Sequence, residues 1–257
     1  MLSLAQSSDS VFCIEWIPSE SGPKVLKYKK IKASFDSSTY AKFLDSILCD
    51  FNISSSNDSN ALSLSLDIDS VGLTSFKYDD KIPFKDYTQW YEEKILGSYI
   101  VDNYDIYYYK LYDTNNIAMV IYISKDLKKN IIKSCDKNNL EIQHLGIDIF
   151  SANISVNQIY KSKKMKSYVV WKVDRNNIHY ITYFQDNNLK HYLKIKIRKN
   201  INVLQYIGGK EFQNKLIQWI DSLIFDKKGS ISFFDNIYVY QTKSGFSFIK
   251  QILKKNK

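Results

Sequence analysis

Residues 168–197 have the sequence YVVWKVDRNNIHYITYFQDNNLKHYLKIKI. Three runs rich in β-branched and aromatic residues cover 168–173, 177–184 and 189–197, a composition typical of β-strands. Short polar segments at 174–177 and 185–188 separate the runs. Their Asp and Asn residues tolerate the left-handed backbone that tight turns need. The stretch therefore predicts three consecutive antiparallel strands.

A similar arrangement occurs near the N-terminus. Residues 11–17 form a short apolar strand, and residues 24–31 return as the second strand of a hairpin. A helix at 39–49, capped by Ser37 or Ser38, and a half-buried strand at 62–66 are predicted next, from helical spacing and from strict alternation. Because a hairpin opens both halves, we expect a duplicated α/β fold.

Between the two halves, the pattern predicts a small inserted α/β segment. Ser124 is placed to cap a helix, in which Leu127, Ile131, Ile132 and Cys135 share the inward face. The expected elements are a helix at 86–95, strands at 104–112 and 117–123, the helix at 125–137, an extended segment at 140–150, and beyond the second hairpin a helix at 210–225, a strand at 236–240 and a helix at 246–253.

Composition excludes several classes of protein. The chain has 257 residues, of which 44% are apolar and 25% are charged, as in ordinary globular proteins. Three scattered cysteines argue against a disulfide framework, and His144, His179 and His191 lack metal-ligand spacing. The chain begins without a signal peptide, and no apolar run reaches the roughly 18 residues of a membrane span. We therefore expect a soluble, cytoplasmic protein with no metal site and no small-molecule substrate.

Charge is distributed unevenly along the chain. Residues 1–150 hold 16 Lys and 21 Asp or Glu, a net charge of −5, whereas residues 151–257 hold 18 Lys and 2 Arg against 6 acids, a net charge of +14. A membrane surface, a nucleic acid or another protein would suit the basic half, as would simple solvation. The residues expected to contact an anionic surface are Lys163, Lys164, Lys194, Lys196 and Arg198.

A family resemblance rests mainly on the inserted segment. Its residues include Pro83-Phe84, Trp90, the strand Ala118-Met-Val-Ile-Tyr-Ile123, Asn138-Asn-Leu140 and Ile147-Asp-Ile-Phe-Ser-Ala152. Taken in their order along the chain, these segments resemble the insert of PilM-type type IV pilus assembly proteins, which belong to the actin-like ATPase superfamily. The chain is also similar to the cytoplasmic domain of GspL from type II secretion. The resemblance implies an actin-like (ribonuclease H-like) duplicated fold with subdomains at 1–80, 81–152 and 153–257, and without a lid subdomain.

The phosphate loops of that family are altered in this chain. Both loops should contain Asp-x-Gly, because the glycine lets backbone amides approach phosphate. The resemblance puts the first loop at Glu15, Ile17 and Ser19, with Pro18 and Glu20 between and beyond them, and the second at Val173 and Asp174. Neither contains the glycine. We therefore expect no bound nucleotide, no other cofactor and no catalytic residue.

The resemblance also implies a partner. PilM-type proteins bind a short cytoplasmic peptide of a membrane-anchored, PilN-like protein in a groove, which would lie here between 62–76 and 104–123. Its expected lining is Leu64, Leu66, Tyr104, Tyr107 and Tyr109, although packing of these tyrosines in a core is the competing interpretation. The expected role is a scaffold at the inner membrane. The alternatives are a diverged ATPase or sugar-kinase relative that holds a metal with Glu15 or Asp174, and a nucleic-acid-binding protein.

Overall fold

The computed structural model describes residues 1–7, 10–20, 22–32, 40–50, 61–111, 116–159, 166–225 and 236–241. The chain divides into two compact units. Unit 1 comprises Met1–Gly72, Leu96–Ile106 and Ile121–Ser151, and unit 2 comprises Leu73–Ile95, Tyr107–Val120 and Ala152–Lys257. Within the described residues, no helix is both long and apolar enough to cross a membrane.

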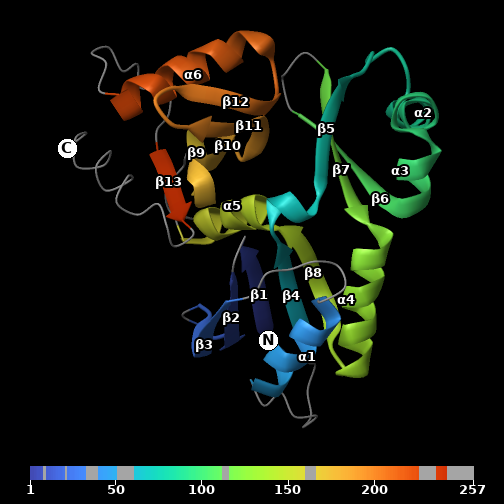
Figure 1. Ribbon diagram of the computed structural model, residues 1–257, viewed down its shortest axis with the longest axis vertical. Coiled ribbons are helices and arrows are strands. Elements are labelled where there is room, and N and C mark those ends of the chain that lie inside the picture. The colour runs from blue at the N-terminus through green and yellow to red at the C-terminus, as the bar shows by residue number, and fades with distance from the viewer. Residues whose placement is uncertain are drawn as a thin grey trace. The chain divides into compact units, whose positions relative to one another are not determined.

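Unit 1 is built on a five-stranded sheet in the order β3-β2-β1-β4-β8 (Figure 1). Strands β1, β2 and β3 form an antiparallel meander, and β4 and β8 run parallel to β1. Its strands are β1 (Leu2–Ser7), β2 (Ser10–Ile17), β3 (Lys24–Lys32), β4 (Ala61–Leu66) and β8 (Glu141–Ile147). The predicted hairpin of 11–17 and 24–31 is thus confirmed as β2 and β3.

Strand β1 is missing from the sequence interpretation, which began the first hairpin at residue 11. The strand is short, and only Leu2 and Leu4 mark its apolar face. In the structure it lies at the centre of the sheet, between β2 and β4. Strand β4 was expected to be half-buried, but five of its six residues are buried. Polar Ser65 is among them, because strands flank β4 on both edges and helices cover its faces.

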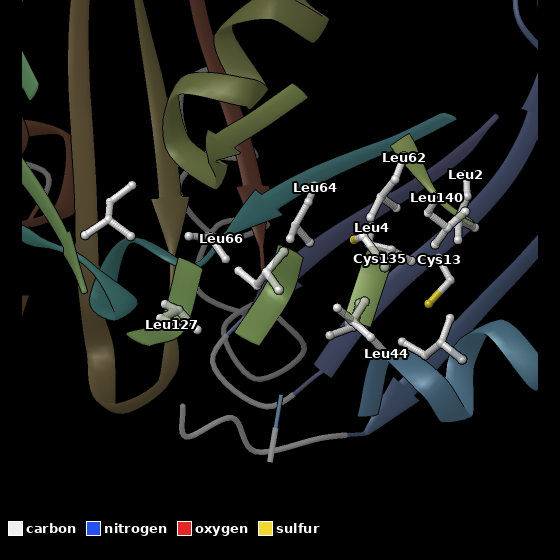
Figure 2. Close-up of a cluster of buried hydrophobic side chains, with 14 residues drawn as sticks. Leu2, Leu4, Cys13, Leu44, Leu62, Leu64, Leu66, Leu127, Cys135 and Leu140 are labelled. Carbon is white, nitrogen blue, oxygen red and sulfur yellow. The ribbon is translucent and has the colours of Figure 1, made fainter. Parts of the chain in front are cut away.

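The core of unit 1 lies between this sheet and two helices, α1 (Tyr40–Asp50) and α4 (Lys125–Lys137). Figure 2 shows side chains from the strands and from both helices meeting there. Of the four residues predicted to face inward from α4, Leu127, Ile131 and Cys135 are buried. Ile132 is the exception, since 41% of its surface is exposed at the edge of the helix's apolar face.

Helix α4 begins where the sequence predicts. Ser124 is its N-cap, and the Ser124 hydroxyl accepts a hydrogen bond from the backbone N–H of Leu127 at 3.4 Å. The helix ends at Asn138, and Asn139 has a φ of 52°, the left-handed conformation that Asn tolerates after a helix. The predicted bounds of 125–137 are therefore confirmed.

Replacing Ser124 with alanine is expected to lower the free energy of unfolding by about 1 kcal/mol, because the first turn of α4 loses its side-chain cap. Urea denaturation followed by circular dichroism measures the change. Lys129→Ala, on the exposed face of the same helix, is the control and should change stability much less. Equal effects of the two substitutions would contradict a capping role for Ser124.

The inserted segment forms a three-stranded sheet in the order β5-β7-β6. Its aromatic side chains pack on one another: Phe76 stacks on Tyr91 with ring centroids 4.3 Å apart, and Tyr108 meets Phe76 edge-on at 6.1 Å. The elements are β5 (Gly72–Lys77), α2 (Phe84–Tyr91), a π-helical turn (Glu92–Leu96), α3 (Gly97–Asn103), β6 (Tyr104–Lys110) and β7 (Ile117–Ser124).

Unit 2 contains a second five-stranded sheet in the order β12-β11-β10-β9-β13. Asn176, Asn177, Asp186 and Asn187 have φ between 49° and 63°, which confirms the two predicted Asp/Asn turns of the meander. The elements are β9 (Ser167–Val173), a 3-10 turn (Arg175–Asn177), β10 (Ile178–Gln185), β11 (Asn188–Ile197), β12 (Ile201–Ile207), α6 (Lys210–Phe225) and β13 (Asn236–Gln241). Helix α6 covers one face of this sheet and shares a core with it.

Besides β1, β5 and α3, two further strands or helices were not predicted from the sequence. Strand β12 extends the meander, and helix α5 (Asp148–Ile159) occupies the end of the segment expected to be extended. The sequence of α5 has a weak helical apolar pattern, because its Ser and Asn residues interrupt the apolar face. The helix caps at Ser37 or Ser38, the helix at 246–253 and Lys163 with Lys164 lie outside the described residues.

Candidate functional site

The carboxyl ends of the three parallel strands of unit 1 carry polar side chains. Ser7 ends β1, Asp67 follows β4 and Asp148 follows β8. All three are buried, with exposed fractions of 4%, 2% and 8%. Open α/β sheets bind their ligands at this edge, outside the carboxyl ends of the strands. An acidic residue directly after a buried strand was the available sequence signal, and the sequence interpretation assigned no site role to it.

Hydrogen bonds to the backbone occupy both carboxylates. Asp67 Oδ1 accepts the N–H of Asp69 at 2.8 Å. Asp148 Oδ1 accepts the N–H of Ile149 at 2.7 Å and the N–H of Ile68 at 3.2 Å. The second bond of Asp148 joins the end of β8 to the end of β4. Asp148 therefore holds two strand ends together, whereas Asp67 caps the 3-10 turn that follows β4, and these hydrogen bonds are sufficient to account for the burial of both carboxylates.

Ser7 differs from the two aspartates. Its buried hydroxyl has no hydrogen-bond partner among the described residues. Residues 8 and 9, which connect β1 to β2, lie outside the described part of the chain. The Ser7 hydroxyl is therefore the polar group of unit 1 with capacity for a further hydrogen bond at the strand ends.

The first expected phosphate loop was assigned to the wrong connection. Glu15 and Ile17 belong to β2, with Glu15 opposite Lys27 of β3. Ser19 closes the β2–β3 turn, where its N–H donates to Gly22 O at 3.2 Å and its hydroxyl also donates to that carbonyl. In a duplicated fold the loop should follow the strand that pairs antiparallel with one neighbour and parallel with another, and in unit 1 this strand is β1.

The second expected phosphate loop lies where the sequence put it. Strand β9 pairs antiparallel with β10 and parallel with β13, which is the same pairing as that of β1. Val173 is the last residue of β9, and Asp174 opens the connection to β10 with its N–H bonded to Ile178 O at 2.8 Å. Val173 is 2% exposed and Asp174 is 5% exposed.

A buried ammonium group neutralises Asp174. Lys172 Nζ lies 3.6 Å from Asp174 Oδ2, and the side chain of Lys172 has no exposed surface. The same nitrogen lies 5.0 Å from the centroid of the Tyr180 ring, a cation–π contact. A charge that is buried to this degree needs such partners, because burial without them is very unfavourable. Lys172 was not singled out from the sequence, since an isolated lysine in an apolar strand has no distinctive pattern.

The expected basic surface is only partly exposed. Leu193, Ile195 and Ile197 of β11 pack in the core with α6, as predicted from alternation. Lys194 and Lys196 lie on the opposite face but are half-buried, and Lys194 Nζ also contacts the Tyr180 ring, at 5.1 Å. Arg198 is exposed beyond the end of the strand. The three side chains therefore do not form one uniformly exposed surface.

The two strand histidines of unit 2 are structural. His179 pairs with Ile195, whereas His191 pairs with Tyr183, so they lie at different positions of the β10–β11 ladder. His179 Nδ1 accepts the Trp171 indole N–H at 3.0 Å. Burial lowers the pKa of each histidine to about 4, and the charge of Lys190 adds to the effect at His191. Both imidazoles are therefore neutral near pH 7.

The surroundings of His191 require a glycine. Its ring stacks on Phe212 with centroids 4.1 Å apart, and its Nδ1 lies 2.8 Å from the Tyr206 hydroxyl. Gly208 has a φ of +149°, and a Cβ there would lie 2.1 Å from His191 Nδ1. Gly208, shortly before α6, therefore serves backbone geometry and close packing.

The residues expected to bind a partner fall into different environments. Tyr107 and Tyr109 are 44% and 42% exposed on the same face of β6, an edge strand. Tyr104 lies on the other face by alternation and meets Tyr122 edge-on at 5.5 Å. On that other face, burial raises the pKa of Tyr108, whose hydroxyl donates to Glu92 Oε1 at 2.7 Å.

The structure contradicts the assignment of Leu64 and Leu66 to this binding surface. Their exposed fractions are 1% and 0%, and both belong to the core between the sheet and helices α1 and α4 (Figure 2). The alternation of β4 indicated one inward face and one outward face, but the neighbouring strands and helices bury both. These leucines stabilise unit 1 and are inaccessible to a partner.

Unit 2 also contains a cleft of about 580 Å³ between β5, β12 and the beginning of α6. Ser75, Phe76 and Leu204 line it. Gln205 of β12 donates from Nε2 to Leu73 O at 2.6 Å and so joins the two strands. One wall therefore comes from the expected 62–76 region, whereas 104–123 contributes Ile117 and most of the other wall comes from β12 and the beginning of α6.

Comparisons with known proteins identify the fold. No family model matches the sequence, and no match is found among curated proteins. A chain of a PilM–PilN type IV pilus biogenesis complex matches 84% of this chain over 64% of its own length, with 11% identity and a TM-score of 0.55. Identity this low shows a shared fold, and the expected α/β, actin-like fold of the PilM type is confirmed.

Two other solved structures match with lower TM-scores. One is a protein of unknown function with an actin-like ATPase fold from Bacteroides thetaiotaomicron VPI-5482, which matches 99% of this chain over 86% of its own, with 14% identity and a TM-score of 0.47. The other is the cytoplasmic domain of EpsL, an inner-membrane component of the Vibrio cholerae type II secretion system. It matches 100% of this chain over 95% of its own, with 8% identity and a TM-score of 0.45.

Proposed function

We propose that this protein is a non-catalytic scaffold of a type IV pilus or type II secretion-like assembly platform, located in the cytoplasm at the inner membrane. The observation that carries the non-catalytic part is the buried Lys172 ammonium, 3.6 Å from Asp174. The fold shared with a chain of a pilus biogenesis complex supports the assembly role.

The chemistry of the β9–β10 connection explains why no cofactor is expected. A nucleotide-binding loop offers backbone amides to phosphate and a carboxylate to a hydrated metal ion. Here the Lys172 ammonium neutralises Asp174, which reduces the attraction of the carboxylate for a divalent cation. Val173 adds a β-branched side chain where the family pattern has small residues. The loop is therefore suited to a structural role.

The proposed partner is a short cytoplasmic peptide of a membrane-anchored, PilN-like protein. Tyr107 and Tyr109 project from one face of β6, and β6 is an edge strand, so its backbone can pair with an extended peptide. Exposed tyrosines are frequent anchors in such interfaces. We therefore assign the peptide to the outer edge of β6 and omit Leu64 and Leu66 from the contact.

Peptide titration tests this assignment. Synthetic peptides would cover the cytoplasmic segment of a candidate single-span membrane partner, and fluorescence anisotropy would report binding. Tyr107→Ala/Tyr109→Ala is expected to weaken binding by about tenfold or more, as expected for truncated aromatic anchors. Leu204→Ser in the β5–β12 cleft is the matched control. If the tyrosine variant binds the peptide with unchanged affinity, or if the control loses more affinity than the tyrosine variant, the peptide does not bind at β6.

The main alternative is a diverged ATPase or sugar-kinase relative. The Ser7 hydroxyl without a partner, at the carboxyl end of β1, is the observation that favours it. Isothermal titration calorimetry with Mg-ATP decides between the two proposals. Heat of binding that Ser7→Ala abolishes would support a nucleotide site, whereas no heat at millimolar nucleotide supports the scaffold.

Nucleic-acid binding is the weakest alternative. It would rest on the lysines of the second half, and Lys194 and Lys196 are half-buried. If these lysines bound the phosphates of a nucleic acid, the affinity would decrease steeply as the salt concentration rises. We therefore propose no nucleic-acid partner.

A further inference from the structure

Strand β3 has an unusual surface for an edge strand. Its sequence is KVLKYKKIK, and it forms the outer edge of the sheet of unit 1 (Figure 1). Its five lysines lie in the half of the chain that is acidic as a whole. Apolar side chains are exposed among them, with 56% of Val25, 51% of Leu26 and 58% of Tyr28 accessible.

These apolar residues belong to the face of the sheet that points away from the core. Val11 and Cys13 of β2 belong to the core, and Ile31, which pairs with Val11, packs against it. Tyr28 pairs with Ile14, and Val25 pairs with Trp16. Because Ile14 and Trp16 alternate with the core positions of β2, these two pairs lie on the opposite face of the sheet. The pairing shifts between Glu15 and Trp16, so Leu26 is a bulged residue without an opposite partner.

The same face extends into β2. Phe12, Ile14 and Trp16 are half-buried there. The Trp16 indole N–H donates to the Ser3 hydroxyl at 2.8 Å, which holds the ring on this face. Lys30 lies over the Phe12 ring, with its Nζ 4.7 Å from the centroid. By the same pairing, Lys30 and Lys32 lie on this face among the aromatic and aliphatic side chains, and we call this surface the β2–β3 face. Lys24, Lys27 and Lys29, opposite Ile17, Glu15 and Cys13, alternate to the other face of the strand.

Protection of the edge explains only part of this composition. Lysines on an edge strand prevent pairing with a second copy of the chain, because like charges would meet. Protection of the edge does not explain why Val25, Leu26 and Tyr28 are exposed, because exposed apolar side chains favour association with other molecules. Two acids lie nearby, Glu15 opposite Lys27 and Glu20 in the turn, so the positive charge of the strand is only partly offset.

We infer that the β2–β3 face docks unit 1 on a membrane surface rich in anionic lipid. The lysines attract the headgroups, and Val25, Leu26 and Tyr28 enter the boundary between headgroups and acyl chains. Tyrosine and tryptophan favour this boundary, which suits Tyr28 and Trp16. The surface is separate from β6, so lipid binding does not depend on the proposed peptide site.

Lipid fits the β2–β3 face better than other polyanions do. Nucleic acids and acidic peptides would use the lysines, but they gain little from exposed aliphatic side chains such as Val25 and Leu26. A lipid surface uses both kinds of residue at once. The apolar residues are therefore the part of the face whose removal separates the two classes of partner.

Flotation of the full chain with vesicles tests the inference. Vesicles of phosphatidylcholine alone are compared with vesicles that also contain phosphatidylglycerol, at low and high salt. We expect binding to the mixed vesicles alone, weakened by salt. Each lysine near an anionic surface contributes roughly a fivefold gain in affinity, so Lys30→Gln/Lys32→Gln should weaken binding about 25-fold.

Two further variants make the result specific. Lys129→Gln/Lys133→Gln removes the same charge from exposed positions elsewhere and should bind nearly as well as the natural chain. Leu26→Ser/Tyr28→Ser keeps every charge and should weaken vesicle binding severalfold while leaving binding to polyglutamate unchanged. Circular dichroism and urea denaturation verify that each variant is folded.

Three results would overturn the inference. The first is no binding of the natural chain to the mixed vesicles. The second is an equal loss in both double-lysine variants, which would show only a dependence on net charge. The third is vesicle binding that Leu26→Ser/Tyr28→Ser leaves intact, because the β2–β3 face would then be a general polyanion site.

Discussion

Replacing Lys172 with methionine is expected to lower the free energy of unfolding by about 3–5 kcal/mol. Methionine fills a similar volume but carries no charge, so the Asp174 carboxylate, 5% exposed, loses the ammonium that lies 3.6 Å away. An unneutralised buried carboxylate is more costly than the loss of any single surface contact. Urea denaturation at pH 7 measures the change.

The double variant Lys172→Met/Asp174→Leu separates the ion pair from simple packing. Removing both charges together avoids the unneutralised carboxylate, so most of the lost stability should return. Lys199→Met, at an exposed position, is the control for the substitution itself and should have a small effect. If Lys172→Met is tolerated as well as the control, Lys172 is not the charge partner of Asp174, and the argument against a metal at Asp174 fails with it.

The stability of unit 2 is expected to fall as the pH is lowered from about 6.5 to about 4. Burial lowers the pKa of His179 and His191 to about 4 in the folded protein, whereas an unfolded histidine titrates near 6.5. Below pH 6.5 the unfolded chain binds protons that the folded chain does not, so stability decreases through this window. The full contribution of the two neutral imidazoles is present only above the unfolded pKa.

The size of this effect is about 3 kcal/mol for each histidine, since one pKa unit corresponds to about 1.4 kcal/mol. His191→Phe preserves a ring against Phe212 and removes one of the two titrating groups, so the loss between pH 6.5 and pH 4 should decrease by about half. His144→Gln, at an exposed position, is the control for the removal of a histidine. A profile that His191→Phe does not alter would assign the acid sensitivity to other groups.

Several local features of the fold followed from the sequence. The Asp/Asn turns of the second meander, the cap at Ser124 and the bounds of α4 and α6 agree with the structure. Each of these signals is contained within a few neighbouring residues, because turn conformation, helix capping and helical spacing depend on nearby backbone and side chains. The alternation of β6 likewise separates Tyr107 and Tyr109 from Tyr108.

The environment of each strand was decided only by the tertiary structure. Strand β1 carries few apolar residues, yet it is central because β2 and β4 pair with it from different parts of the chain. That pairing moves the first phosphate-loop position from Glu15, Ile17 and Ser19 to the end of β1. Leu64 and Leu66 are buried for the same reason, since neighbouring elements cover both faces of β4.

The burial of Lys172 likewise depends on tertiary contacts. The sequence by itself determined the two hairpins, the Asp/Asn turns of the second meander, and the bounds of α4 and α6. Only the tertiary structure decided which strands are neighbours, which faces are covered, and that the ammonium of Lys172 lies beside Asp174. The physical reason is that local conformation depends on residues close in sequence, whereas burial and charge pairing depend on residues that folding brings together from distant positions.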